Sequence, residues 1–247
     1  MQIAQPKITV CLASYNGEKF IKEQIESILI QLHPNDELII SDDGSVDNTI
    51  AIISSIIDSR IKLLPNNSFK DPIKNFQNCL QYASGDFVFL SDQDDIWIEK
   101  KCDKMVALLE KYDLVVSDSV IVDEDLNMLE ASFFKFFGSG KGILKNVMKS
   151  SYYGSCMAFR KSLLEKSLPF PNTKEIGHDL WIGLVGEITG KVLFYNEPLI
   201  LYRRHTLAFT VTGLGKSKRS LLQKIKGRII MFREITRFLI KYKWKKD

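Results

Sequence analysis

The sequence lacks any long uncharged apolar run, and none of its segments approaches the ~18 to 20 residues needed to cross a bilayer. Its first ten residues, MQIAQPKITV, lack the basic, apolar and small-residue regions of a secretory signal. It has only four cysteines, widely scattered and without a C-x-x-C pair, which disfavours a disulfide framework and predicts reduced, mostly buried thiols. These absences predict a cytoplasmic protein.

Two phosphate-binding motifs are also missing. There is no G-x-x-x-x-G-K-[ST] segment and no G-x-G-x-x-G after the first predicted strand, so neither a P-loop nor a dinucleotide-binding fold is supported. What the chain does have is 247 residues, of which 45% are hydrophobic and 26% charged. That is enough to close one large core or two small ones, and it excludes a disordered or collagen-like protein.

Charge is unevenly distributed. The net charge is +4, but residues 216–247 carry 12 Lys and Arg against 2 acids, which leaves residues 1–215 with 22 basic and 28 acidic side chains. Apolar residues recur at helical spacing through this basic segment, a pattern that favours an amphipathic helix lying on an anionic membrane surface. The alternative is a solvated helix packed on the body of the protein or on a second subunit, and the oligomeric state stays open.

Strands and helices alternate in the first half. Expected strands over 8–12, 37–41, 61–64 and 86–90 are each followed by a polar turn, and the first three by helical patterns over 21–32, 49–57 and 72–83. The strands are apolar on both faces, as in a parallel sheet covered on both sides. Residues 7–115 therefore predict a doubly wound, mostly parallel α/β half.

The rhythm changes over residues 116–215. We expect two short strands within 113–129, an aromatic, glycine- and lysine-containing segment over 133–150 that is either mobile beside a cleft or an ordinary connector, and a strand over 154–160. A helix over 178–188 and a terminal strand pair over 192–195 and 199–202 follow. The chain thus divides into one domain of two halves, 1–215, and the basic segment 216–247.

Acidic side chains follow two of the expected strands. Asp42 and Asp43 end the second strand, and Asp92, Asp94 and Asp95 follow the fourth. Because ligands of open parallel sheets bind beyond the carboxyl ends of the strands, these acids should converge at one edge. Their repulsion predicts a hard divalent cation there, Mg²⁺ or Mn²⁺, with Asp92 and Asp94 on the same side. The alternative is that the acids cap a helix beginning near Trp97.

Tyr15 and Asp42 are candidates for contact with a base. Asp42 could accept a hydrogen bond from a ring N–H while Tyr15 stacks on the ring. The alternatives are that Tyr15 packs and that Asp42 caps its turn. Trp97, Trp181 and the phenylalanines of 133–137 could offer faces to sugar rings, although aromatic residues at helical spacing are more often core.

Five blocks of sequence, in this order, resemble the family 2 glycosyltransferases of GT-A fold, over roughly residues 7–210. The blocks are ASYNGEKFI (13–21), IISDDGSVDNT (39–49), FLSDQDDIW (89–97), GHDLW (177–181) and YRRH (202–205). SDQDDIW is similar to a bacterial subgroup often described as rhamnosyltransferases. The resemblance implies sugar transfer from a nucleotide sugar, with UDP- and dTDP-sugars as candidate donors, to a saccharide or lipid-linked saccharide at the inner face of the cell membrane.

The resemblance also implies roles for residues of the first half. Ala13 and Tyr15 match the loop that holds the nucleotide, and Asp42 matches the acid that recognises a pyrimidine. Asp92 and Asp94 match the D-x-D motif, Asp92 near ribose and metal and Asp94 as the firmer metal ligand. Asp95 matches a frequent third acid.

In the second half, Asp179 matches the catalytic base, although His178 replaces the glutamate that usually precedes it. His205 falls where many relatives place a further metal ligand, and Arg203 where it can approach the diphosphate. The Q-x-x-R-W motif of processive synthases is missing, which favours addition of a single sugar.

Transfer by this arrangement should invert the anomeric carbon, since the attacking hydroxyl and the departing diphosphate occupy opposite faces and no second carboxylate is placed as a nucleophile. Three alternatives stay open. One is a nucleotidyltransferase, which would ordinarily need a basic Gly-rich loop after its first strand. The others are a non-catalytic sugar-nucleotide binder and a nucleic-acid-binding protein acting through its basic segment, although the body is acidic and no nucleic-acid-binding signature is present, so we expect no nucleic-acid partner.

Overall fold

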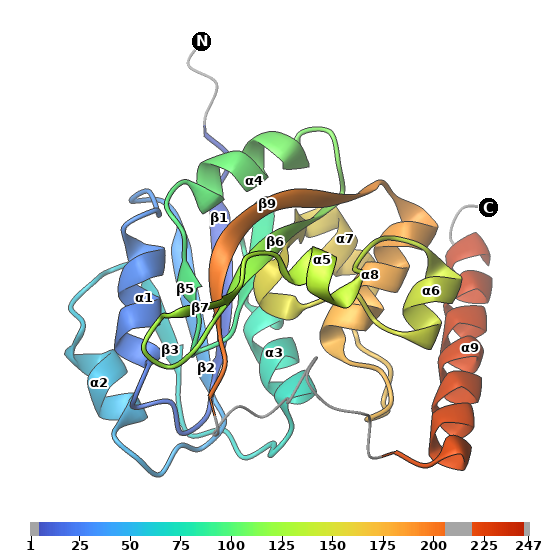
Figure 1. Ribbon diagram of the computed structural model, residues 1–247. Helices are drawn as coiled ribbons and strands as arrows, with labels where there is room; N and C mark the ends of the chain where they lie inside the picture. The colour runs from blue at the N-terminus through green and yellow to red at the C-terminus, as the bar shows by residue number, and fades with distance from the viewer. Residues whose placement is uncertain (1–4, 206–218, 245–247) are drawn as a thin grey trace.

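A computed structural model describes residues 5–205 and 219–244 (Figure 1). A nine-stranded sheet forms its centre, in the order β3-β2-β1-β4-β8-β6-β9-β5, with β7 paired to β6. The strands are β1 (Ile8–Ser14), β2 (Glu37–Asp42), β3 (Ile61–Leu64), β4 (Phe87–Ser91), β5 (Ile96–Trp97), β6 (Leu114–Val122), β7 (Met128–Glu130), β8 (Met157–Arg160) and β9 (Val192–Arg203).

The first half has the predicted parallel arrangement. Strands β3, β2, β1 and β4 are mutually parallel neighbours, and the central pair β1 and β4 is almost entirely buried. Helices α1 (Ile21–Leu29), α2 (Thr49–Ser55) and α3 (Pro72–Gln81) follow the first three strands. Helix α3 begins as the sequence indicates, with Pro72 in its first turn and the Asp71 side chain accepting a hydrogen bond from the Ile73 amide at 2.9 Å. The predicted doubly wound, mostly parallel α/β fold is confirmed.

The second half inserts an antiparallel strand into this sheet. Strand β8 lies between β4 and β6 and is antiparallel to both, while β6 and β9 are parallel. The remaining helices are α4 (Lys101–Leu109), α5 (Phe133–Phe137), α6 (Ile143–Met148), the 3₁₀ turn η1 (Gly154–Cys156), α7 (Lys161–Ser167), α8 (His178–Thr189) and α9 (Leu221–Trp244). Two strands in 113–129 and the helix from His178 are confirmed.

Several predictions for this half were wrong. The expected terminal pair is one long strand, β9, which continues through Pro198 because its pairing register with β6 shifts there. The helix expected near Trp97 begins at Lys101, since residues 96–97 instead pair with β9 as β5. For residues 133–150 the connector alternative is confirmed, because they contain helices α5 and α6, and Phe133 and Phe134 of α5 are buried.

The four cysteines are free and buried, as predicted. One lysine is buried in the core. Lys101 is fully buried: its Nζ donates to the Ser155 carbonyl at 2.8 Å and lies 4.8 Å from the Trp97 ring centre. Burial lowers the pKa of Lys101 to about 8.

Helix α9 stands at one edge of the molecule beside α6 (Figure 1). Its Met231 and Ile235 are buried, and Phe238 meets the Trp181 ring edge-on at 5.7 Å. The basic helix is therefore packed on the body of the protein; the rest of the 216–247 segment, 216–218 and 245–247, and the last residues of the first domain, 206–215, lie outside the described residues. Within 5–205 and 219–244, no helix is both long and apolar enough for a membrane span.

Candidate active site

The carboxyl ends of β1, β2 and β4 meet at one edge of the sheet. Ser14 is paired with Asp42, and Leu12 with Ser91, so the residues that follow these strands leave the sheet together. This places the loops beginning at Tyr15, Asp43 and Asp92 side by side, as the parallel topology requires. Ala13, partly buried within β1, supports the first of these loops from inside the sheet.

Asp42 is fully buried and holds the turn after β2. Its Oδ1 accepts from the amides of Gly44 and Ser45 at 3.1 and 2.8 Å, and its Oδ2 from the hydroxyls of Ser14 and Ser45 at 3.0 and 2.5 Å. Asp42 therefore caps the turn after β2, which was one of its two predicted roles. A role toward a base stays a prediction.

Tyr15 is 53% exposed, so its ring is open to a stacking partner, and its backbone is held by a residue that sequence reasoning missed. Gln93 Oε1 accepts from the Tyr15 amide at 2.8 Å, and Gln93 Nε2 donates to the Tyr15 carbonyl at 3.0 Å. A Cβ at Gly17 would collide with the same Gln93 amide, which accounts for glycine there. Gln93 therefore ties the loop after β1 to the loop of the D-x-D motif.

We expect Gln93→Ala to weaken nucleotide binding about tenfold, because two hydrogen bonds that order the Tyr15 loop are lost. Calorimetric titration with UDP measures this. Gln93→Met is the matched control for side-chain volume and should lose as much affinity as Gln93→Ala. Wild-type affinity in Gln93→Met would show that the hydrogen bonds are not what orders the loop.

The D-x-D acids lie close to one another, and Asp92 also lies close to Asp179. Burial raises the pKa of Asp92 well above its usual range, and repulsion from Asp95, Asp94 and Asp179 adds to the effect. Burial and the Asp94 charge raise the pKa of Asp95 to about 7. We call Asp92, Asp94, Asp95 and Asp179 the acid cluster. Residues from the loop after β4 and from α8, far apart in the sequence, thus share one electrostatic environment that favours a cation.

Asp94 and His205 are brought together as predicted. Asp94 Oδ2 lies 2.8 Å from His205 Nε2, and the imidazole is almost fully enclosed, with its ring centre 4.8 Å from that of Phe20. Its Nδ1 is buried without a hydrogen-bond partner among the described residues. Carboxylate oxygen and imidazole nitrogen beside further acids form a donor set that suits Mn²⁺ or Mg²⁺.

Within the described part of the chain, no three His, Cys, Asp or Glu side chains gather closely enough to hold a metal by themselves. Mg²⁺ is usually bound through one or two carboxylates plus substrate phosphates and water. Asp94 and His205, with Asp92 near them, are the residues that would supply the protein's share.

Arg203 is bonded to the D-x-D loop and to α1. Its amide donates to Asp95 Oδ1 at 3.1 Å, its Nε to the Asp94 carbonyl at 3.0 Å, and its Nη2 to Glu23 Oε2 at 2.6 Å. The guanidinium also lies 4.5 Å from the Phe20 ring centre. These bonds position the D-x-D loop, and an approach of Arg203 to the diphosphate stays a prediction.

Asp95 is the buried acid of the motif. Its Oδ2 has no hydrogen-bond partner among the described residues, and the positive charge of the buried Lys101 counters its own. Asp95 therefore supports the loop from inside, and it does so without capping α4, since that helix begins six residues later at Lys101.

Asp179 lies in the first turn of α8 with its Oδ1 accepting from the Leu180 amide at 2.7 Å. Burial and this bond act in opposite directions, and burial prevails, raising the pKa of Asp179 to about 6. A carboxylate with such a pKa is a suitable general base near neutral pH. Asp179 remains the predicted base.

The residue before it has a packing role. The His178 ring stacks on Phe76 with centres 4.0 Å apart, and burial lowers the pKa of His178 to about 3, so the imidazole is neutral. It joins α8 to α3 at the site. Trp97 and Trp181 are 3% and 5% exposed, and the Trp181 indole donates to the Ser167 carbonyl at 3.0 Å. Both belong to the core, so neither offers a face to a sugar in this structure.

Comparison with known proteins gives a family match and a shared fold. Residues 9–168 match the model of Glycosyl transferase family 2. Over 125 residues the chain is 38% identical to the glycosyltransferase EpsE of Bacillus subtilis, which covers 48% of this chain and 45% of EpsE. Over 187 residues it is 28% identical to UDP-Glc:alpha-D-GlcNAc-diphosphoundecaprenol beta-1,3-glucosyltransferase WfgD of Escherichia coli, covering 72% of this chain and 69% of WfgD.

Among solved structures, S. aureus TarS 1–349 in complex with UDP-GlcNAc has the same fold. The TM-score is 0.65 at 19% identity, over 87% of this chain and 62% of that one. This likeness confirms the predicted architecture. The chain spans about half the length of EpsE and about two thirds of the other two proteins.

Proposed function

Because this chain belongs to glycosyl transferase family 2, we propose that it transfers a single sugar from a nucleoside diphosphate sugar to a saccharide or lipid-linked saccharide in bacterial surface polysaccharide synthesis. The observation that carries the proposal is the acid cluster, in which Asp92 of the D-x-D loop lies near enough to both Asp94 and Asp179 for its charge to interact with theirs. A metal-diphosphate site and a general base thus share one site. The family match gives no support to the nucleotidyltransferase alternative.

In the proposed reaction the nucleotide lies over the loop of Ala13 and Tyr15, with Asp42 toward the base. Asp94 and His205 would hold a divalent ion, Mn²⁺ or Mg²⁺, and Asp92 would serve the ribose and the ion. Bound there, the ion supplies positive charge against the diphosphate as negative charge develops on it.

Asp179 takes the proton of the acceptor hydroxyl as the oxygen bonds to the anomeric carbon. The bond from that carbon to the phosphate oxygen breaks, and its electron pair leaves with the nucleoside diphosphate. Attack from the face opposite the departing group inverts the configuration. Arg203 and Gln93 keep the D-x-D loop and the Tyr15 loop in place throughout.

A donor panel tests the proposal. UDP- and dTDP-sugars, dTDP-rhamnose included, are incubated with Mn²⁺ or Mg²⁺ and with a synthetic lipid carrying α-linked GlcNAc diphosphate, and release of nucleoside diphosphate is measured. We expect metal-dependent release from one donor, faster with an acceptor. No release from any donor, with or without metal, would contradict an enzymatic role and leave a non-catalytic nucleotide-sugar binder.

We further propose that α9 attaches the protein to the inner face of the cell membrane. Helix α9 has a second apolar face besides the one packed on the body. Its members lie on one side of the helix and are 38% to 79% exposed: Leu221, Leu222, Ile225, Ile229, Phe232, Leu239 and Ile240. Exposed Lys226, Arg233 and Arg237 lie beside this stripe, and Glu234 is the helix's one acid. An exposed apolar stripe bordered by cations fits an anionic lipid surface.

Vesicle binding measures this attachment. We expect the protein to sediment with vesicles of phosphatidylcholine and phosphatidylglycerol, and less at high salt. The triple variant Lys226→Glu, Arg233→Glu, Arg237→Glu should bind at least about a hundredfold more weakly, at about 1 kcal/mol per basic residue. Lys22→Glu, Lys62→Glu, Lys111→Glu is the matched control on distant exposed sites. No vesicle binding together with a dimer that the α9 triple variant abolishes would favour a second subunit instead.

A further inference from the structure

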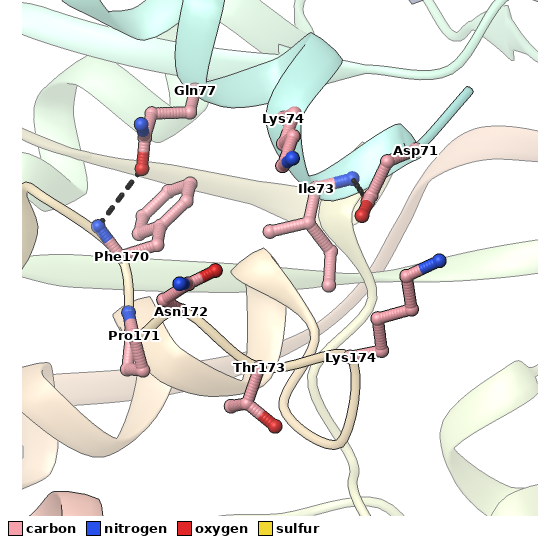
Figure 2. A pocket seen from close by; sticks show the side chains of 9 residues that line it. All are labelled: Asp71, Ile73, Lys74, Gln77, Phe170, Pro171, Asn172, Thr173 and Lys174. Atoms are coloured by element: carbon pink, nitrogen blue, oxygen red, sulfur yellow. Dashed lines mark hydrogen bonds between the residues drawn. The ribbon is translucent and has the colours of Figure 1, made fainter. Parts of the chain in front are cut away.

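A cavity of about 420 Å³ lies between the first turns of α3 and the loop 170–174 that leads toward α8 (Figure 2). The size suits one or two sugar rings. Its position is fixed at both walls: Gln77 Oε1 accepts from the Phe170 amide at 3.0 Å, and Asp71 caps α3. The cavity is lined by Asp71, Ile73, Lys74, Gln77, Phe170, Pro171, Asn172, Thr173 and Lys174.

The lining combines hydrogen-bonding groups of both kinds with an apolar wall. Lys74, Lys174 and the amides of Gln77 and Asn172 donate, the Asp71 carboxylate and Asn172 oxygen accept, and Ile73, Phe170 and Pro171 form the apolar part (Figure 2). Sugar rings present hydroxyls that both donate and accept, together with C–H faces. A carboxylate in the wall disfavours a purely anionic ligand.

The cavity also connects two elements of the proposed function. On one side its loop runs into α8, whose first turn carries Asp179, and the stacked pair Phe76 and His178 joins α3 to α8 there. On the other side, Glu175 at the end of the loop forms an ion pair with Arg219 just before α9. The cavity thus lies between the proposed base and the proposed membrane-facing helix.

We propose that this cavity binds a saccharide portion of the acceptor, with Lys74 and Asn172 as specificity-determining contacts. The inference rests on the proposed function. A membrane-anchored acceptor would then have its lipid at the α9 face and its sugar between α3 and the 170–174 loop, on the route to Asp179.

Binding and kinetics together test the inference. Saturation-transfer NMR with methyl α-glycosides of GlcNAc, glucose, galactose and rhamnose measures binding without any need for turnover. Transfer to the synthetic GlcNAc-diphosphate lipid measures the KM for acceptor and for donor separately. Lys74→Ala and Asn172→Ala each remove one exposed side chain from the lining, Asn172→Trp fills the cavity, and Lys111→Ala is the matched control outside it.

We expect at least one glycoside to bind wild type and Lys111→Ala but not Asn172→Trp. Lys74→Ala and Asn172→Ala should raise the KM for acceptor about tenfold, with the KM for donor unchanged. The inference is overturned if no glycoside binds, if inorganic pyrophosphate displaces the glycoside, or if acceptor and donor KM move together. The wild type could bind a glycoside that Asn172→Trp does not bind, and yet turn over no donor. That result would contradict the proposed function and support the sugar site.

Discussion

Asp179→Asn should lower the rate of sugar transfer by about a thousandfold or more and leave the KM for the donor nearly unchanged. The amide cannot take the acceptor's proton, and general-base catalysis contributes ~10² to 10⁴ in rate. The exchange keeps the shape of the side chain, and its oxygen can still accept from the Leu180 amide. Steady-state kinetics with donor and acceptor varied separately give the measurement. A variant with wild-type turnover would remove Asp179 from the mechanism.

The pH profile of the wild type provides a second readout of the same group. Since burial raises the pKa of Asp179 to about 6, the base is protonated and inactive below that pH and becomes active above it. We expect kcat/KM to rise tenfold per pH unit at low pH and to level off above about 6. The small residual activity of Asp179→Asn should lack this inflection. A wild-type profile flat from pH 5 to 8 would contradict the assignment.

Stability supplies the control for folding. A carboxyl whose pKa is raised in the folded state binds its proton more tightly there than in the unfolded chain. Proton binding therefore stabilises the fold below the unfolded pKa, and this stabilisation is lost as pH rises through the folded pKa. Asp179 therefore destabilises the fold above pH 6, by roughly 3 kcal/mol. Asp179→Asn should raise the melting temperature at pH 8 and leave it nearly unchanged at pH 4. If Asp179→Asn instead had a lower melting temperature at pH 8, its loss of activity would be explained by unfolding.

The parts of the fold that sequence predicted well are those governed by local pattern. Apolar runs such as the one ending at Ser14, followed by polar turns and helical spacing, define the parallel half because β1, β2 and β4 are buried on both faces. The second half was less predictable. Strand β9 continues across Pro198 through a register shift set by β6, and the two residues of β5 owe their conformation to pairing with β9. Those partners are distant in the sequence and leave no local signal.

The site residues also differ in how far the sequence alone indicates them. Asp92, Asp94 and Asp179 were identified because acids after a buried strand or in a matching motif stand out in a sequence. Gln93 has no such signal, since its importance lies in two hydrogen bonds to a loop 78 residues away. Lys101 resembles any surface lysine in the sequence, and its burial depends on the carbonyl of Ser155, the ring of Trp97 and the charge of Asp95. Side chains that support a site from behind depend on tertiary contacts that pattern alone does not contain.

Asp94→Ala should abolish metal-dependent turnover. Asp94 is both the partner of His205 and a source of the repulsion that raises the pKa of Asp92, so its removal takes away the metal ligand and relieves the acid cluster at once. Without metal the variant should therefore be at least as stable as wild type, while Mn²⁺ with UDP should raise the melting temperature of wild type only. Calorimetry and thermal unfolding read this independently of turnover.

His205→Ala separates the two parts of that argument. It removes the second proposed ligand and leaves the acids in place, so the variant should bind Mn²⁺ more weakly without the relief of repulsion that Asp94→Ala provides. If Asp94→Ala kept Mn²⁺-stimulated release of nucleoside diphosphate, the acid cluster would need another cation to balance it. Lys101 is the buried candidate, but its Nζ already donates to Ser155 and its charge already faces Asp95. As long as Asp94 is present and no metal is bound, the charge of Asp94 repels that of Asp92. We therefore expect that an ion, and not a side chain, completes the site.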